Sequence, residues 1–234
     1  MPKHMLLLMV ISLAITTPAA AAQAPTVAVT LEFKQAEVSK LRGYDIVKVD
    51  DLPLTGKPGH PLLPSKVCHV LLPPGARKAK LTAIVTESEE IDMSLLIAPA
   101  QPPCCPYVPY QPAEPDPEVY NSTQPYPGVV AKLEQVGCYH GYRLARIRVY
   151  PVQYTPAERK AVFIRKLTLV LEVESWTQQG TPPPPPPEAE KWIGRCTLNP
   201  TLAAEYTKYH KVVKEQIDYL IITREMFLQA LQSF

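Results

Sequence analysis

The sequence predicts an all-β fold, in which residues 26–176 form an antiparallel β-sandwich. Two observations support this prediction. Short runs of alternating apolar and polar residues, separated by glycine and proline, fill the chain from Thr26 to Glu174. None of these runs has the length and the 3.6-residue period of a long helix, whereas a period of two is typical of strands that bury one face. Successive strands without intervening helices pack as two sheets.

The first strand is expected at residues 26–33, because Val27, Val29, Leu31 and Phe33 share one face there. The following strands are apolar or alternating runs that end at turn residues such as glycine and proline. They are expected at residues 44–49, 67–72, 81–85, 129–136 and 142–154.

The clearest strand is expected at residues 161–173, where Leu167, Leu169 and Leu171 lie on one face. Residues 155–160 would join it to the preceding strand as a hairpin. That hairpin completes a set of about seven strands, which is typical of a sandwich.

Three arginines, Arg143, Arg146 and Arg148, lie close together on one predicted strand. A basic binding stripe is one interpretation. We favour a solvated strand face whose charges pair with Glu172 and Glu174 across the sheet.

The first 22 residues are expected to be a secretory signal peptide. Lys3 and His4 precede an apolar run at residues 5–15, which is too short to span a bilayer comfortably. Small residues follow, with cleavage expected after Ala22 or Ala24. The mature chain would therefore be extracellular or periplasmic. A retained membrane anchor is the alternative.

Proline is concentrated in two segments. Residues 99–127 hold ten prolines, and since proline cannot donate to a sheet ladder, we expect a long loop that lies over the sandwich. Residues 182–187 are six consecutive prolines, which favour a stiff polyproline II spacer. This spacer belongs to a linker and connector expected at residues 177–216, in which residues 188–216 are polar and expected to be partly helical.

The last segment, residues 217–234, has a different pattern. A continuous apolar run, Tyr219 to Ile222, is typical of a strand buried on both faces. Apolar residues at helical spacing follow it. We expect these residues to be the first strand and helix of a further α/β domain.

Composition and motifs give little support for catalysis, metal binding or nucleic-acid binding by this chain. The net charge of +2 does not favour nucleic acid as a partner. Cys68-His69 and Cys138-Tyr139-His140 suggest a metal site or a Cys–His nucleophile, but neither has the converging ligands or the orienting third group that such sites need. We therefore assign no catalytic residue, no metal ligand and no cofactor.

Several phrases, in their order and spacing, resemble propeptides of the gingipain-like C25 family of cysteine peptidases. The first is Gly59-His60-Pro61-Leu62-Leu63-Pro64, which is similar to a Gly-x-Pro-x-Leu-Pro signature. The other similar segments are residues 70–75, 97–103, 141–154, 198–200 and 217–231. The turn at residues 155–160 departs from the family pattern because it lacks the expected glycine.

This resemblance implies a prodomain that holds a cysteine peptidase latent and assists its folding until it is cut off. Its partner would be its own peptidase domain, whose catalytic His and Cys would lie beyond Phe234, so the chain as given would not be an enzyme. After removal of the signal, no membrane or nucleic-acid partner is expected.

Some members of the family cleave after basic residues, which implies that processing occurs after a basic residue in the connector. Arg195 and Lys214 are the positions that we expect.

A second function class is a secreted binding module without a protease role. Tyr107, Tyr110, Tyr120 and Tyr126 in the proline-rich segment could stack on sugars or contact another protein.

Overall fold

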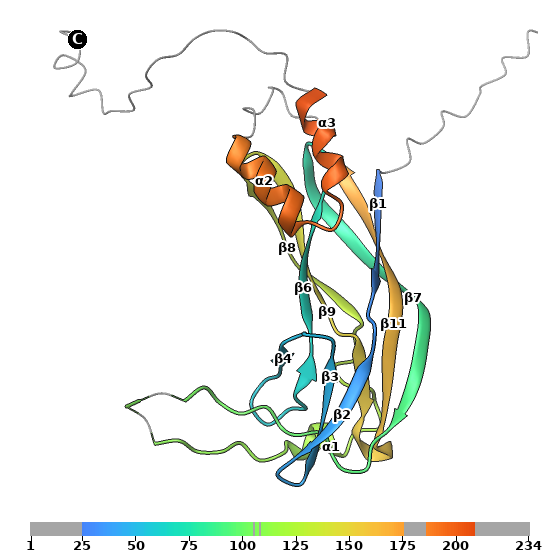
Figure 1. The fold of residues 1–234 in the computed structure, drawn as a ribbon, viewed down its shortest axis with the longest axis vertical. Coiled ribbons are helices and arrows are strands. Elements are labelled where there is room, and N and C mark those ends of the chain that lie inside the picture. Colours follow the sequence, from blue (N-terminus) through green and yellow to red (C-terminus); the bar gives the residue numbers. More distant parts are fainter. Residues whose placement is uncertain (1–24, 105, 108, 176–185, 209–234) are drawn as a thin grey trace, which may run out of the picture.

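Two antiparallel sheets pack face to face and bury one continuous core between them (Figure 1). The computed structural model describes residues 25–104, 106–107, 109–175 and 186–208. The predicted signal peptide, with Ala22 and Ala24, lies outside the described residues. So do Lys214 and the predicted start of a further domain at residues 217–234.

The first sheet is built around β11 (Lys160–Ser175). Along one edge of β11 runs β7 (Ala76–Asp92), and along the other edge lie β1 (Thr26–Glu32) and β10 (Val152–Thr155). The register places Val29 opposite Leu169 and Leu31 opposite Leu167. All four side chains are buried, so the alternation in β1 and β11 matches the two faces of this sheet.

The second sheet has three strands in the order β6 (Lys66–Leu71), β9 (Tyr142–Val149) and β8 (Ala131–Tyr139). Its inner face contributes Val70 and Ile147, which are fully buried in the same core as Leu169 of the first sheet. Complete burial of each such aliphatic side chain stabilises the fold by about 2 kcal/mol. The predicted all-β sandwich is therefore confirmed.

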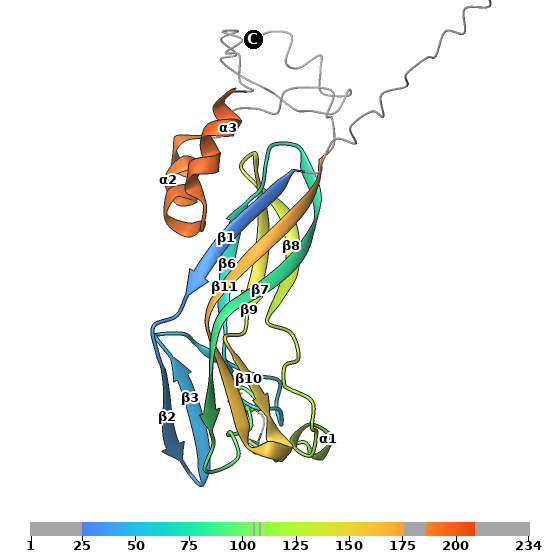
Figure 2. The same cartoon turned by 90° about the vertical axis from the view of Figure 1, so that its right-hand side faces the viewer.

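Smaller elements gather at one end of the sandwich (Figures 1 and 2). They are the ribbon β2 (Ala36–Leu41) and β3 (Tyr44–Val49), the short pair β4 (Leu54–Thr55) and β5 (Leu63–Pro64), the single turn α1 (Pro117–Tyr120) and the 3₁₀ turn η1 (Pro156–Glu158).

The opposite end carries the helical part of the connector (Figure 2). It consists of α2 (Pro187–Cys196), the 3₁₀ turn η2 (Pro200–Leu202) and α3 (Ala203–Lys208). No helix within the described ranges is long and apolar enough to cross a membrane.

Two strands differ from their predicted lengths for physical reasons. β7 begins at Ala76, five residues before the predicted start, and continues seven residues beyond the predicted end at Val85, to Asp92. Its continuation is charged and exposed, so it carries no alternating pattern. The predicted strand at residues 142–154 is instead two strands, β9 and β10, in two different sheets. The break falls at Pro151, which has no N–H to donate to a ladder.

The hairpin that lacks glycine forms without it. Arg159 takes the left-handed conformation, with φ 53° and ψ 41°, and closes the turn between η1 and β11. A glycine would adopt this conformation without steric cost, which explains why glycine is expected there.

The proline-rich segment does not lie over the sandwich as expected. Between residues 101 and 113, the described parts extend away from the strands at the end that holds β2 and β3 (Figure 1). Tyr107, in this projecting arm, is 98% exposed.

Candidate functional site

The connector does not leave the sandwich as a free tether: residues 187–208 pack onto it. Ala189 and Ile193 of α2 and Tyr206 of α3 are buried against Leu71 of β6 and Tyr142 of β9. The buried residues of this second, smaller core differ from those between the sheets, and the partly buried Leu202 packs against both cores. We call residues 187–208 the docked connector.

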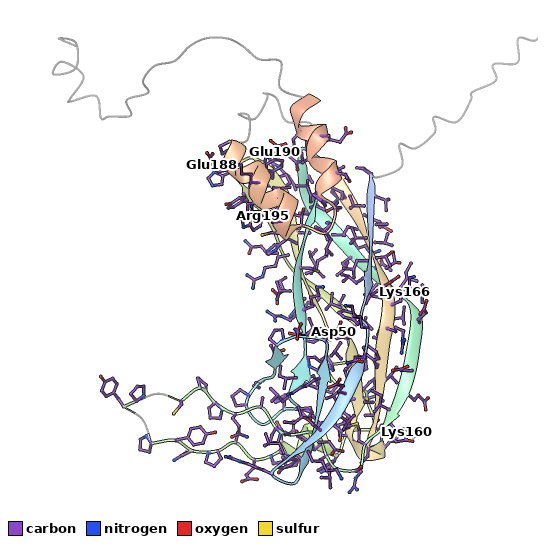
Figure 3. All side chains as sticks on the ribbon, viewed as in Figure 1. Asp50, Lys160, Lys166, Glu188, Glu190 and Arg195 are labelled. Carbon is purple, nitrogen blue, oxygen red and sulfur yellow. The ribbon has the colours of Figure 1, made fainter. Side chains whose placement is uncertain are left out.

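The first element of the docked connector, α2, forms where its sequence favours a helix. Pro187 occupies the first helical position, where its missing N–H costs nothing. Glu188 and Glu190 lie in the first turn and Arg195 lies in the last, the charge arrangement that complements the helix dipole (Figure 3). The helix ends at Cys196, and the Oγ1 of the C-cap residue Thr197 donates to the carbonyl oxygen of Ile193 at 2.7 Å.

Aromatic side chains pack at the more exposed side of the contact between α2 and the sandwich. The ring of Trp192 lies 4.5 Å from the ring of Tyr139 and 5.6 Å from that of His69, centroid to centroid. Burial and, to a smaller extent, the nearby guanidinium of Arg146 lower the pKa of His69. His69 therefore resists protonation where it packs against Trp192.

Asn199 fixes the connector to the edge of β6. The backbone N–H of Leu71 donates to Oδ1 of Asn199 at 2.7 Å, and Nδ2 of Asn199 donates to the carbonyl oxygen of Leu71 at 2.8 Å. The N–H of Leu198 donates to the carbonyl oxygen of His69 at 2.9 Å. The connector thus satisfies backbone groups that an edge strand otherwise leaves unpaired.

Tyr206 makes the second fixed point. Its hydroxyl donates to the carbonyl oxygen of Leu72 at 2.6 Å and accepts from the N–H of Arg143 at 2.9 Å. Burial raises the pKa of this phenol, so the hydroxyl stays protonated and able to donate. One side chain of α3 therefore contacts the ends of both β6 and β9.

Arg195, a predicted processing residue, lies in this docked connector. Its side chain is exposed at the end of α2 opposite Glu188 (Figure 3). Its backbone is helical, and two residues later Thr197 forms a parallel bridge with His69. Lys214, the other predicted position, lies outside the described residues.

The four tyrosines considered for sugar stacking do not form one platform. Tyr120 is buried and donates to the carbonyl oxygen of Ile97 at 2.7 Å, and Tyr126 packs against the main core. Only Tyr107 and Tyr110 are exposed, on the projecting arm. Gln101 fixes the base of the arm, because its amide both donates to and accepts from the backbone of Ala113 at 3.0 Å.

The cysteine–histidine pairs do not converge. Cys68 points into the core, where burial raises the pKa of its thiol to about 11, whereas His69 faces the connector. Cys138 is exposed at the end of β8. Within the part of the chain that the structure describes, no three His, Cys, Asp or Glu side chains gather as metal ligands.

The arginines of β9 do not pair with Glu172 and Glu174, the partners expected from the sequence. Arg146 and Arg148 of β9 both contact Glu134 of the neighbouring strand β8, at 3.0 and 2.6 Å. Glu172 and Glu174 lie in the other sheet. Arg146 and Arg148 are therefore paired within their own sheet, as for a solvated face, but with another partner, whereas Nε of Arg143 donates to the carbonyl oxygen of Ala76.

The sequence analysis did not predict that residues 187–208 dock on the sandwich. The contacts of this docked connector come from isolated residues such as Asn199 and Tyr206, which belong to no motif. The amphipathic spacing of Ala189, Trp192 and Ile193 was the one available signal, since it places these three side chains on one helical face.

Comparisons with known proteins agree with this architecture. The model of the family Propeptide_C25 matches residues 26–181. The fold is similar to a chain in the complex of Porphyromonas gingivalis RgpB pro- and mature domains, with a TM-score of 0.62 and 14% identity over 78% of this chain and 95% of that chain. It is also similar to a chain from a structure on the zymogenic latency of gingipain K from Porphyromonas gingivalis, with a TM-score of 0.50 and 18% identity over 68% of this chain and 97% of that chain. None of the curated proteins compared with the sequence matches it.

Proposed function

The chain belongs to the Propeptide_C25 family, and on this premise we propose that its sandwich holds a C25-type cysteine peptidase latent and assists its folding until the connector is cut. The titles of the two similar structures speak of pro- and mature domains in complex and of zymogenic latency. The observation in this chain that supports the proposal is the docked connector, which holds residues 187–208 on the strands β6 and β9.

The physical basis is effective concentration. A folded inhibitor joined to its target by a short link experiences a local concentration in the millimolar range, so that even a modest surface contact is almost always made. Docking of residues 187–208 shortens the free part of the link, since these residues are held on β6 and β9. Cutting the link removes this advantage, and the released propeptide then dissociates by its intrinsic affinity.

The processing and secretion steps belong to the same proposal. We propose that the signal peptide is removed after Ala22 or Ala24 and that the precursor is exported. Cleavage after Arg195 or Lys214 would then separate the two parts. N-terminal sequencing of the exported precursor and of the mature peptidase tests both sites, and a mature N-terminus far from residues 196 and 215 would reject the processing positions.

Inhibition in trans tests the central claim. Purified residues 23–214 are added to the peptidase domain of the same precursor, and hydrolysis of a peptide substrate is followed. We expect concentration-dependent inhibition and a higher yield when the denatured peptidase is refolded in the presence of the propeptide. A folded propeptide that leaves both quantities unchanged would reject the proposal.

A binding module remains the second candidate, and one observation favours it. Tyr107 and Tyr110 are exposed on an arm whose base is fixed by Gln101. A glycan array or a protein pull-down separates the candidates. Tight glycan binding that is lost in Tyr107→Ala, together with no inhibition of the peptidase, would favour the module.

A further inference from the structure

We infer that docking of the connector makes Arg195 a conditional cleavage site, which a protease can use only after residues 187–208 have left the sheet. The inference deepens the proposed function, because it says when one of the two proposed processing positions becomes available. The protection itself depends only on the contacts of the docked connector and can be measured without the peptidase.

The local conformation around Arg195 explains the protection. A peptidase binds several residues on either side of the scissile bond in an extended conformation. The eight residues before Arg195 belong to α2, and Thr197 and Leu198 are hydrogen-bonded to Ile193 and His69. An extended segment around the Arg195–Cys196 bond therefore requires both unwinding of α2 and release from β6. Cleavage then follows the population of the opened state, not the exposure of the arginine side chain.

The docked state is held by few, identifiable contacts. Asn199 and Tyr206 each make two hydrogen bonds with backbone groups of the sheets. Ile193 is fully buried in the second core. Loss of any one of them shifts the equilibrium toward the opened state. The main core between the sheets is retained, because its buried residues all lie in the sandwich and the connector adds only the partly buried Leu198 and Leu202.

The helix that carries Arg195 is also weak by itself. α2 has ten residues, which is too short to be stable without packing. Gly194, directly before Arg195, lowers its helical propensity further. A Cβ built on Gly194 has no atom within 4 Å, so nothing in the packing requires glycine at this position. The glycine keeps α2 easy to unwind next to the cleavable bond.

Limited proteolysis of the full chain with trypsin tests the inference. The rate of appearance of the fragment that ends at Arg195 is followed by mass spectrometry. We expect this rate to increase about tenfold in Asn199→Ala, which removes both hydrogen bonds to Leu71. We expect it to fall about threefold or more in Gly194→Ala, which adds helical propensity without a clash.

Two controls complete the experiment. Asn121→Ala makes the same substitution at the end of α1, at the opposite end of the sandwich, and should leave the rate unchanged. Arg195→Gln in the Asn199→Ala background should remove the fragment. Far-UV circular dichroism confirms that the sandwich of each variant is folded.

The possible outcomes are distinct. Equal rates in the wild type and in both Asn199→Ala and Gly194→Ala would overturn the inference, as would rapid cleavage after Arg195 in the wild type. If these rates change as expected while the trans assay shows no inhibition, the conditional site stands and only the proposed function fails. If Asn199→Ala does not fold, the slower cleavage of Gly194→Ala still decides the question.

Discussion

Asn199 pairs both groups of its side-chain amide with the backbone of Leu71, 128 residues earlier in the chain. The amide acts as one residue of a neighbouring strand would, accepting from the N–H and donating to the carbonyl oxygen. An edge position of β6 is thereby closed by a single side chain. The connector is attached to the sandwich through backbone atoms, which any residue except proline would provide at position 71.

Asn199→Asp should destabilise the chain more at pH 7 than at pH 3.5. An ionised carboxylate accepts from the N–H of Leu71 but faces its carbonyl oxygen without a proton to donate. Below the ordinary carboxyl pKa of about 3.9, the protonated group can donate again. The expected loss at pH 7 is about 1–3 kcal/mol, the cost of an unsatisfied buried group. Denaturant unfolding at both pH values, each against the wild type, measures it; a larger loss at pH 3.5 would contradict the prediction.

Tyr206→Phe should lower the free energy of unfolding by about 1–3 kcal/mol. The ring and its packing against Tyr142 remain, but the carbonyl oxygen of Leu72 and the N–H of Arg143 lose their partner. The matched control is Tyr107→Phe, whose hydroxyl lies on the exposed arm and whose loss should change stability by less than about 0.5 kcal/mol. Thermal or denaturant unfolding of the two variants compares them directly.

Docking of the connector should weaken in acid through His69. Its pKa is lowered in the folded chain, chiefly by burial and then by Arg146. The folded state therefore binds this proton less readily than the unfolded state, so the contribution of His69 to stability is complete above its ordinary pKa and is lost as pH falls below it.

Fluorescence of Trp192 in a Trp176→Phe background reports this effect. We expect the emission to shift to longer wavelength between pH 7.5 and pH 5 and the shift to be reduced in His69→Gln, which cannot be protonated there. An equal shift in the two proteins would assign the acid response to other groups.

Cys68 should be unreactive in the folded chain. Its thiol is buried, its pKa is raised to about 11, and it donates to the carbonyl oxygen of Ile147. Since the thiolate is the reactive form, alkylation at pH 8 should be slower than that of the exposed Cys138 and Cys196 by a factor of about 100 or more. Peptide mass mapping after short treatment with iodoacetamide, with and without denaturant, gives the rates. Fast alkylation of Cys68 in the native chain would show that the core opens readily at β6.

Arg159→Gly should stabilise the chain by about 0.5–1 kcal/mol, because glycine occupies the left-handed conformation without steric cost. Lys80→Gly in β7 is the matched control, and it should have the opposite sign since glycine weakens an extended strand. Denaturant unfolding of both variants gives the comparison. Destabilisation by Arg159→Gly would mean that the arginine side chain matters more to this turn than its backbone does.

The sequence predicts the part of the fold that depends on one-sided burial. β1 and β11 bury alternate residues such as Val29 and Leu169, so their period of two is visible in the sequence. β2 and the continuation of β7 are exposed on nearly every residue and therefore leave no period to detect. The break between β9 and β10 was marked by Pro151, but the change of sheet there depends on packing between segments far apart in the chain.

The candidate site was predictable only in part. Arg195 was singled out because a basic residue in a connector suits a processing protease; its side chain is exposed, and its role in processing stays a prediction. Its protection was not foreseen, since it depends on Asn199 and Tyr206, polar residues whose partners are backbone atoms of Leu71, Leu72 and Arg143. Because residues of almost every type have these backbone groups, the sequence does not reveal which of them will be hydrogen-bonded by a side chain.

The contact between Leu71 and Asn199 also sets an order of events during synthesis. At roughly 5–20 residues per second, the 128 residues between them take on the order of 10 s to be made. Until then one edge of β6 lacks this partner, although the strands of both sheets have already been synthesised. Docking of the connector is therefore the last step in building this fold, because Asn199 is made after every strand of the two sheets.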